Sequence, residues 1–241
     1  NLLIKDSTGI TIHDLSVVGA NAQAGLSDQA WRPAFAFQHG FSIRDSSRVT
    51  LDRVGASDVF GDFVYIRGGS QIVVRDSRFA RNGRQGIAVA DGHDVTIEDN
   101  VLSDVRQASF DLEPISPEWV VDGITIRGNT VGPYRLTFLS SKTGGTVRNV
   151  LIEGNTVDGT LRTIVSAERY AIADNRWSNW IFRDNRASRI WRGSGSPLSF
   201  TRIDGLVIEG NVQPMSGQPF VHLSDCPGAL VASNVIDGTG P

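Results

Sequence analysis

One short phrase recurs along the chain and constrains the fold more than any other feature. It places apolar residues at alternate positions and then reaches an Asp or Gly, usually followed by Asn, as in the segment Val95-Thr-Ile97-Glu-Asp99-Asn100. With the Asn position as the register mark, copies fall at 15, 54, 77, 100, 129, 155, 185, 211 and 234. Apolar spacing of two indicates strands, and a repeat of roughly 23 residues indicates one coil of a solenoid.

A second short strand precedes each copy at a fixed offset. Ile43 leads Val49 by six positions, and Ile66 leads Ile72 by the same interval. Short strands joined in this way stack into parallel sheets, and the usual hand of such connections makes the coil right-handed. We therefore predict an all-β fold, a right-handed parallel β-helix of about nine coils. We expect one domain over residues 1–241, as a segment of a longer chain.

The Asn residues at the turns have a structural explanation. Side-chain amides in stacked strands form hydrogen-bonded ladders. We expect such a ladder at the repeated turn position, formed by Asn100, Asn129, Asn155, Asn185 and Asn211.

Charge and hydropathy exclude several partner classes. The formal net charge is only −3, which gives no support to nucleic acid or a charged membrane surface as a partner. No stretch approaches the roughly 18 apolar residues that membrane insertion requires. The first residues lack a basic segment followed by an apolar one, so we expect no signal peptide in this chain.

The repeats resemble those of the right-handed parallel β-helix proteins of the pectate-lyase-like superfamily. Three strings, beginning at Gly61, Arg81 and Phe110, are similar to a subgroup of β-helix-repeat proteins without a settled activity. The superfamily contains polysaccharide lyases, glycoside hydrolases, uronate epimerases and non-catalytic adhesins and tailspikes. The resemblance thus implies a polysaccharide or oligosaccharide partner and a secreted or cell-surface location. It implies no particular reaction.

Strand alternation predicts which side chains face outward near the middle of the chain. One strip carries six large polar residues, namely Arg44, Tyr65, Arg67, Asp111, Glu113 and Arg135. The coil between Arg67 and Asp111 presents only Ala88 and Ala90, so we expect a groove with a small-residue floor. Arg84 and Gln85 enter this coil at its turn and overhang one edge, and Asp62 holds the equivalent turn position one coil earlier. We expect the groove to bind substrate through Arg44, Asp62, Tyr65, Gln85, Trp119 and Arg135.

Two carboxylates on this strip suggest catalysis. Asp111 and Glu113 lie two residues apart on one strand face, which places their Cβ atoms ~7 Å apart. Neighbouring carboxylates raise one pKa and so supply an acid beside a base, as glycoside hydrolases require. We expect Asp111 and Glu113 to be the acid/base pair of a glycosidase and Arg67 and Arg84 to position substrate. Trp119, on an inserted loop, either stacks on a sugar ring or covers its own loop.

Two other functions use the same groove. A polysaccharide lyase or uronate epimerase would take Tyr65, Arg67, Arg84 or Lys142 as its base. It would hold Ca²⁺ through oxygen ligands on Asp111, Glu113 and Asp62. The string at Phe110 lacks the His of the alginate epimerase motif that it loosely resembles, which weighs against epimerisation. The third function is non-catalytic glycan binding by an adhesin or a tailspike-like protein. The hydrolase reading needs no cofactor.

Overall fold

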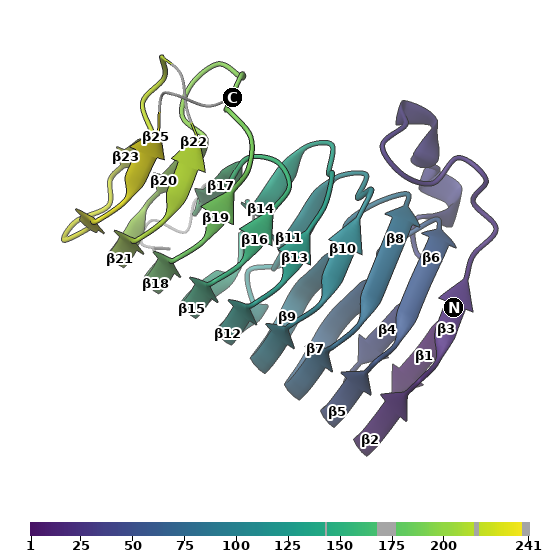
Figure 1. Ribbon diagram of the computed structural model, residues 1–241. Coiled ribbons are helices and arrows are strands. Elements are labelled where there is room, and N and C mark those ends of the chain that lie inside the picture. The colour runs from purple at the N-terminus through teal and green to yellow at the C-terminus, as the bar shows by residue number, and fades with distance from the viewer. Residues whose placement is uncertain (143, 168–176, 215–216, 238–241) are drawn as a thin grey trace.

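The computed structural model describes residues 1–142, 144–167, 177–214 and 217–237, and it confirms the predicted right-handed parallel β-helix (Figure 1). The strand ladders are parallel throughout this described part, and the coils stack from one end of the molecule to the other. Helix is confined there to two short 3₁₀ turns, η1 (Asp28–Ala30) and η2 (Pro33–Phe35). No described helix has the length and hydropathy needed to span a bilayer.

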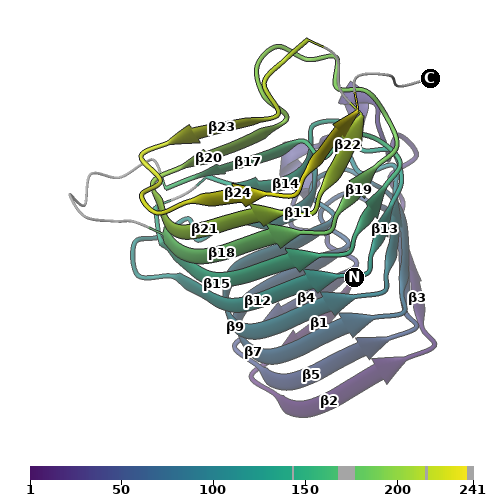
Figure 2. The same cartoon turned by 60° about the vertical axis from the view of Figure 1, so that its left-hand side comes forward.

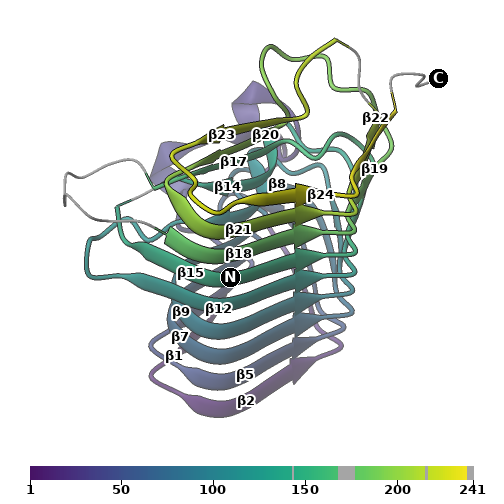
Figure 3. The ribbon, with the colours of Figure 1, turned by 90° about the vertical axis from the view of Figure 1, so that its left-hand side faces the viewer.

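The strands form three faces of the solenoid (Figures 2 and 3). The first face contains β1 (Leu2–Lys5), β4 (Phe41–Arg44), the first parts of β7 (Val64–Arg75) and β9 (Ile87–Glu98), β11 (Ala108–Leu112), β14 (Thr137–Ser141), β17 (Thr163–Ser166), β20 (Leu198–Thr201) and β23 (Val221–Ser224). The second face contains β2 (Thr8–His13), β5 (Ser47–Asp52), the last parts of β7 and β9, β12 (Val120–Arg127), β15 (Thr146–Glu153), β18 (Trp177–Arg183), β21 (Ile203–Glu209) and β24 (Leu230–Ala232). The third face contains β3 (Ser16–Val18), β6 (Gly55–Val59), β8 (Arg78–Asn82), β10 (Val101–Ser103), β13 (Thr130–Val131), β16 (Thr156–Val157), β19 (Arg186–Ala187), β22 (Val212–Pro214) and β25 (Val235–Asp237).

The number of regular turns is smaller than the nine coils expected. The third face is a nine-stranded sheet, but its two edge strands, β3 and β25, each have a single neighbour. About seven turns therefore form the regular body of the solenoid. The end coils are also more exposed, as the residues of β2 and β25 show, because nothing in the described chain stacks on their outer sides.

A continuous hydrophobic core fills the interior of the coils. Inward-facing apolar residues from all three faces belong to one buried cluster. Aromatic rings stack within it from coil to coil: Phe138 contacts Phe110 at 5.6 Å and Phe182 at 6.4 Å between ring centroids. Such contacts span neighbouring coils, so each coil depends on the next for its buried surface.

The predicted Asn ladder is confirmed. The side-chain oxygen of Asn129 accepts hydrogen bonds from the backbone N–H and the side-chain amide of Asn100, both at 3.0 Å. The same pair of bonds repeats through the following coils and ends at Asn234. The five expected residues are fully buried, with 0% exposure. Each one satisfies a backbone donor of the preceding coil that would otherwise be buried without a partner.

The turns that lead from the third face to the first lie on one edge of the solenoid, which we call the corner. The long first insertion, residues 19–40, with η1 and η2, also lies at this edge near β6 and β8 (Figure 1). Gly83 allows its close approach, because a Cβ at that position would lie 2.6 Å from the carbonyl oxygen of Ala30. The corner therefore carries the chain's most elaborate loops beside the strip predicted to hold the site.

Candidate functional site: a charged cluster and a corner pocket

The outward strip on the first face has the predicted register. Parallel pairing aligns Ser42 with Tyr65, Tyr65 with Ala88, Ala88 with Asp111, and Asp111 with Ser140. Tyr65 and Asp111 thus flank Ala88 from opposite sides, at two strand spacings or roughly 9.6 Å. The expected open floor is not present, however. Ala88 and Ala90 are 0% and 1% exposed, so neighbouring groups cover them.

Arg84 joins two of the predicted acidic residues across three coils. Its Nη1 donates to Asp62 at 2.6 Å, and its Nη2 donates to both carboxylate oxygens of Glu113 at 2.7 Å. Asp62 is fully buried, and the side chain of Glu113 is 12% exposed. Burial alone would lower the pKa of Arg84, but the charges of Asp62 and Glu113 raise it, so the guanidinium stays charged. We call Asp62, Arg84, Asp111 and Glu113 the charged cluster.

Asp111 is the least solvated acid on the strip, at 5% exposure. The side-chain amide of Gln85 donates to its Oδ2 at 2.6 Å, and the hydroxyl of Ser140 forms a further hydrogen bond. Burial raises the pKa of Asp111 well above its ordinary value, and the charge of Glu113 adds to this effect. Burial also raises the pKa of Glu113, but there Arg84 opposes it. The pKa of both carboxyl groups is raised, that of Asp111 well above its ordinary value, so Asp111 is the group that more readily keeps a proton.

Asp62 and Gln85 form a second side-chain ladder, at the corner. The backbone N–H of Asp62 donates to Nδ1 of His39, that of Gln85 donates to Oδ1 of Asp62, and that of Ala108 donates to Oε1 of Gln85. The sequence analysis assigned Asp62 and Gln85 to substrate binding, whereas their side-chain oxygens are used here to satisfy buried backbone donors. We call this row the corner ladder.

His39 stands at the start of the corner ladder and is 1% exposed. Its Nδ1 accepts from the backbone N–H of Asp62 at 3.1 Å and lies 3.3 Å from Oδ2 of the same residue. Its ring stacks on Tyr65 with centroids 4.7 Å apart and an interplanar angle of 5°. Burial, and then the charge of Glu113, raise the pKa of Tyr65. Tyr65 therefore forms one side of a packed aromatic layer and is a poor base at neutral pH.

Three further predicted residues contact aromatic or polar neighbours on the same face. The Arg44 guanidinium lies 6.0 Å from the ring centroid of Tyr65, and its Nε donates to Ser42. The Arg67 guanidinium lies 5.7 Å from the ring centroid of Trp119. The Trp119 ring is therefore in contact with Arg67 of the first face. Arg67 lies at an irregular point of the β7–β9 pairing, opposite Asp91.

The acidic residues do not suit the Ca²⁺ site considered for a lyase. Arg84 bridges Asp62 and Glu113 and occupies the space between them. Within the described ranges, no group of three or more His, Cys, Asp or Glu side chains is arranged to hold a metal ion. A cation bound between these carboxylates would have to displace the guanidinium.

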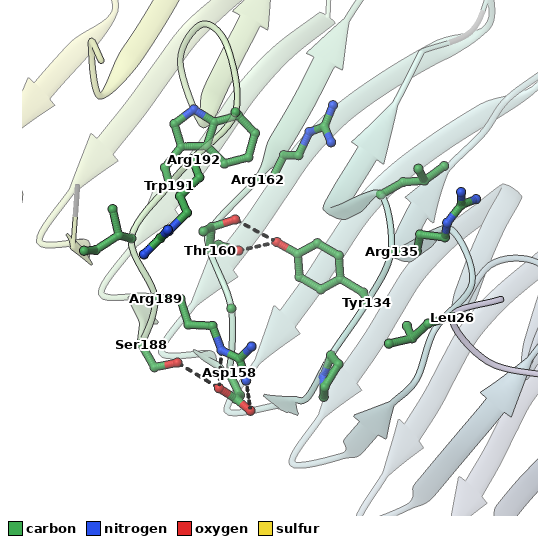
Figure 4. A pocket seen from close by; sticks show the side chains of 15 residues that line it. Leu26, Tyr134, Arg135, Asp158, Thr160, Arg162, Ser188, Arg189, Trp191 and Arg192 are labelled. Atoms are coloured by element: carbon green, nitrogen blue, oxygen red, sulfur yellow. Dashed lines mark hydrogen bonds and ion pairs between the residues drawn. The ribbon is translucent and has the colours of Figure 1, made fainter. Parts of the chain in front are cut away.

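The corner also contains a cavity of about 640 Å³, which the sequence analysis did not predict (Figure 4). We call it the corner pocket. Its wall is made by turns of three successive coils and by Leu26 of the first insertion, and it is lined by Leu26, Pro133, Tyr134, Arg135, Leu136, Asp158, Gly159, Thr160, Arg162, Ser188, Arg189, Ile190, Trp191, Arg192 and Gly193. Of these, only Arg135 was a predicted site residue. The volume is in the range of small-molecule sites.

A smaller cavity of about 260 Å³ adjoins this pocket on the side of the charged cluster. Leu136 and Arg162 line both cavities. Gln85 and Ser140, the two hydrogen-bond partners of Asp111, line the smaller one. The hollow surface therefore runs from the neighbourhood of Asp111 along the corner to the pocket.

These features define a parallel β-solenoid with a hollowed corner beside a buried acid pair. The chain belongs to the family described as the right-handed beta helix region, whose model matches residues 2–157 and 65–212. A comparison with curated protein sequences finds no match.

Solved structures share the fold at low identity. A mutant tailspike protein of E. coli bacteriophage HK620, in complex with pentasaccharide, is 14% identical with a TM-score of 0.57, covering 80% of this chain and 39% of the tailspike. A family 28 exopolygalacturonase of Yersinia enterocolitica is 12% identical with a TM-score of 0.50, covering 84% of this chain and 44% of the enzyme. The chain thus spans less than half the length of either protein.

Proposed function

We propose that the chain is a glycoside hydrolase that cleaves a polysaccharide, with the charged cluster as its catalytic centre. The observation that carries this proposal is the unequal environment of two neighbouring carboxyl groups. Asp111 is buried and has a raised pKa, while Glu113 is held by Arg84. Such a pair supplies an acid and a base at the same pH.

Each carboxyl group has a distinct step in this reaction. Asp111 donates its proton to the glycosidic oxygen as the bond to the anomeric carbon breaks. Glu113 removes a proton from the water that attacks that carbon. The ~7 Å spacing between alternate Cβ atoms on a strand agrees with the wider carboxyl separation of inverting enzymes. Arg84 donates to both carboxylate oxygens of Glu113 and opposes the rise of its pKa. Gln85 and Ser140, the hydrogen-bond partners of Asp111, line the smaller cavity.

The hydrolase is preferred to the lyase for a physical reason. A lyase needs a side chain that removes a proton next to a uronate carboxylate. The raised pKa of Tyr65 leaves its phenol protonated at neutral pH, and Arg84 is committed to two carboxylates. A saccharide ligand also agrees with the pentasaccharide in the tailspike complex and with the name of the exopolygalacturonase.

Release of new reducing ends from a panel of polysaccharides tests the proposal. Asp111→Asn and Glu113→Gln should each lower turnover by at least 100-fold, as expected for loss of a general acid or base. Asp122→Asn is a matched control, because that carboxylate pairs with Arg148 on the second face. Full activity in both cluster variants would refute the site. An unsaturated product absorbing in the ultraviolet would identify a lyase instead.

Non-catalytic glycan binding is the second candidate, and the burial of the cluster favours it. Asp62 and Gln85 are used in the corner ladder, and Arg84 is used in ion pairs, as expected of groups that hold coils together. Saccharide binding without any product from the panel would establish this function in place of hydrolysis.

A further inference from the structure

A column of arginines follows the corner. In five consecutive coils an arginine stands six or seven residues after the ladder position, at Arg84, Arg106, Arg135, Arg162 and Arg192. The similar offset places these residues in successive turns along the corner. A column of like charges is repulsive unless each member has a counter-ion. The acidic partner of each arginine therefore determines whether its charge is available to a ligand.

The first three arginines are neutralised by acids of this chain. Arg84 pairs with Asp62 and Glu113, as described above. Arg106 and Arg135 both pair with Asp28 on the first insertion. These contacts fix the insertion to the corner and cancel most of the charge in the N-terminal part of the column.

The last two arginines have no acidic partner among the described residues. The Arg162 guanidinium lies 5.4 Å from the ring centroid of Trp191, and Arg192 is exposed. Asp158 is the one acid that lines the corner pocket. It is engaged by Arg189, through contacts of 3.1 and 3.0 Å, and by Ser188. Figure 4 shows this ion pair at the opposite end of the pocket from Trp191 and Arg162.

We propose that the corner pocket binds an acidic sugar residue, one that carries a carboxylate or a sulfate group. Stacking on Trp191 orients Arg162, and guanidinium groups bind planar oxyanions through paired hydrogen bonds. Arg192 adds a second unpaired charge. Lys142 lines the adjoining cavity and extends the positive surface toward Asp111.

This inference rests on the proposed function, which supplies the saccharide nature of the ligand. The pocket adds that the bound sugar carries a negative charge. The pocket would hold an acidic unit of the polymer while the neighbouring bond lies near the charged cluster. The indole N–H of Trp191 donates to the carbonyl of Gly195, which fixes the ring against Arg162.

Isothermal titration calorimetry with three trisaccharides tests this proposal: a trigalacturonate, its neutral methyl ester, and a sulfated trisaccharide. The trigalacturonate or the sulfated ligand should bind at least tenfold more tightly than the ester, and their comparison identifies the preferred anion. Arg162→Gln and Arg192→Gln should each remove most of this preference. Arg162→Lys should restore only part of it, because lysine keeps the charge but not the paired donors.

Arg127→Gln is the matched control, since Arg127 pairs with Glu98 on the second face and should leave binding unchanged. Equal affinity for charged and neutral ligands, or unchanged binding in both pocket variants, would overturn the inference. The two proposals fail separately. Cleavage of neutral glycans without anion preference would support the proposed hydrolase and overturn the acidic-sugar pocket. Preferential binding of the anionic trisaccharides without cleavage would support the pocket and overturn the hydrolase. Binding should also persist in Asp111→Asn.

Discussion

Replacing Asn155 by Ala tests how much the Asn ladder contributes to stability. The Asn155 side-chain oxygen accepts from the backbone N–H of Asn129 at 3.0 Å, and its amide donates to the carbonyl of Ile126 at 3.0 Å. Both partners are buried and lose this bond in the variant. The Asn129 side-chain amide keeps other acceptors, so it contributes little to the cost.

The expected cost follows from these two groups. A buried polar group left without its partner costs about 1–3 kcal/mol, so Asn155→Ala should lower the free energy of unfolding by about 3 kcal/mol. Asn234→Ala is the control, because Asn234 stands on the last rung and is only part-buried. Water can replace its side chain there, and the cost should stay below about 1 kcal/mol.

Urea unfolding followed by far-ultraviolet circular dichroism measures both values. The midpoint should fall for Asn155→Ala with an unchanged m value, since the same surface is exposed on unfolding. Equal destabilisation by the two variants would refute the reasoning, because the burial of a ladder position would then not affect its contribution to the free energy of unfolding. A changed m value would show that coils unfold separately.

Three further predictions concern the site and the corner. The raised pKa of Asp111 means that the folded chain keeps a proton which the unfolded chain loses above about pH 4, so stability falls as pH rises through that window. Asp111→Asn should therefore melt at a higher temperature than the parent at pH 7 and at the same temperature at pH 3. Asp28→Asn should release the first insertion, seen as faster limited proteolysis within residues 19–40, whereas a parental rate would show that its ion pairs are dispensable. Gly83→Ala should destabilise by more than Gly154→Ala, because a Cβ at 83 meets backbone oxygens at 2.3 and 2.6 Å, whereas one at 154 meets nothing within 4 Å and has only the strain of a left-handed backbone, with φ of 62°. Equal melting temperatures for the two glycine variants would contradict this.

The repeats were sufficient to predict the fold and the strip. Strand alternation and a constant offset correctly aligned Tyr65, Ala88 and Asp111, because pairing register in stacked coils follows directly from chain spacing. The Asn ladder was predicted for the same reason. The covering of Ala88 and Ala90 was not predicted, since it depends on how the side chains of neighbouring coils pack.

Contacts at the corner could not be predicted from spacing alone. Asp28 pairs with Arg106 across 78 positions, through an insertion whose path no repeat specifies. The sequence did contain one usable signal, an arginine six or seven residues after the ladder position in five coils. Which of them lack a counter-ion depends on loop conformations, so the corner pocket became apparent only in the structure.

The two ladders give the solenoid a chemical direction. In the Asn ladder, a side chain on each coil caps the backbone N–H of the coil before it. In the corner ladder, a side chain caps the N–H of the coil after it. If the chain were cut between the coils of Asp62 and Gln85, the backbone N–H of Gln85 on the C-terminal fragment would thus lose its acceptor at the corner. If it were cut beyond the corner ladder, between the coils of Asn155 and Asn185, the backbone N–H of Asn155 on the N-terminal fragment would lose its acceptor. Any coil grafted after Asn234 must bring an acceptor for the Asn ladder, and one grafted before His39 must bring an acceptor for the corner ladder.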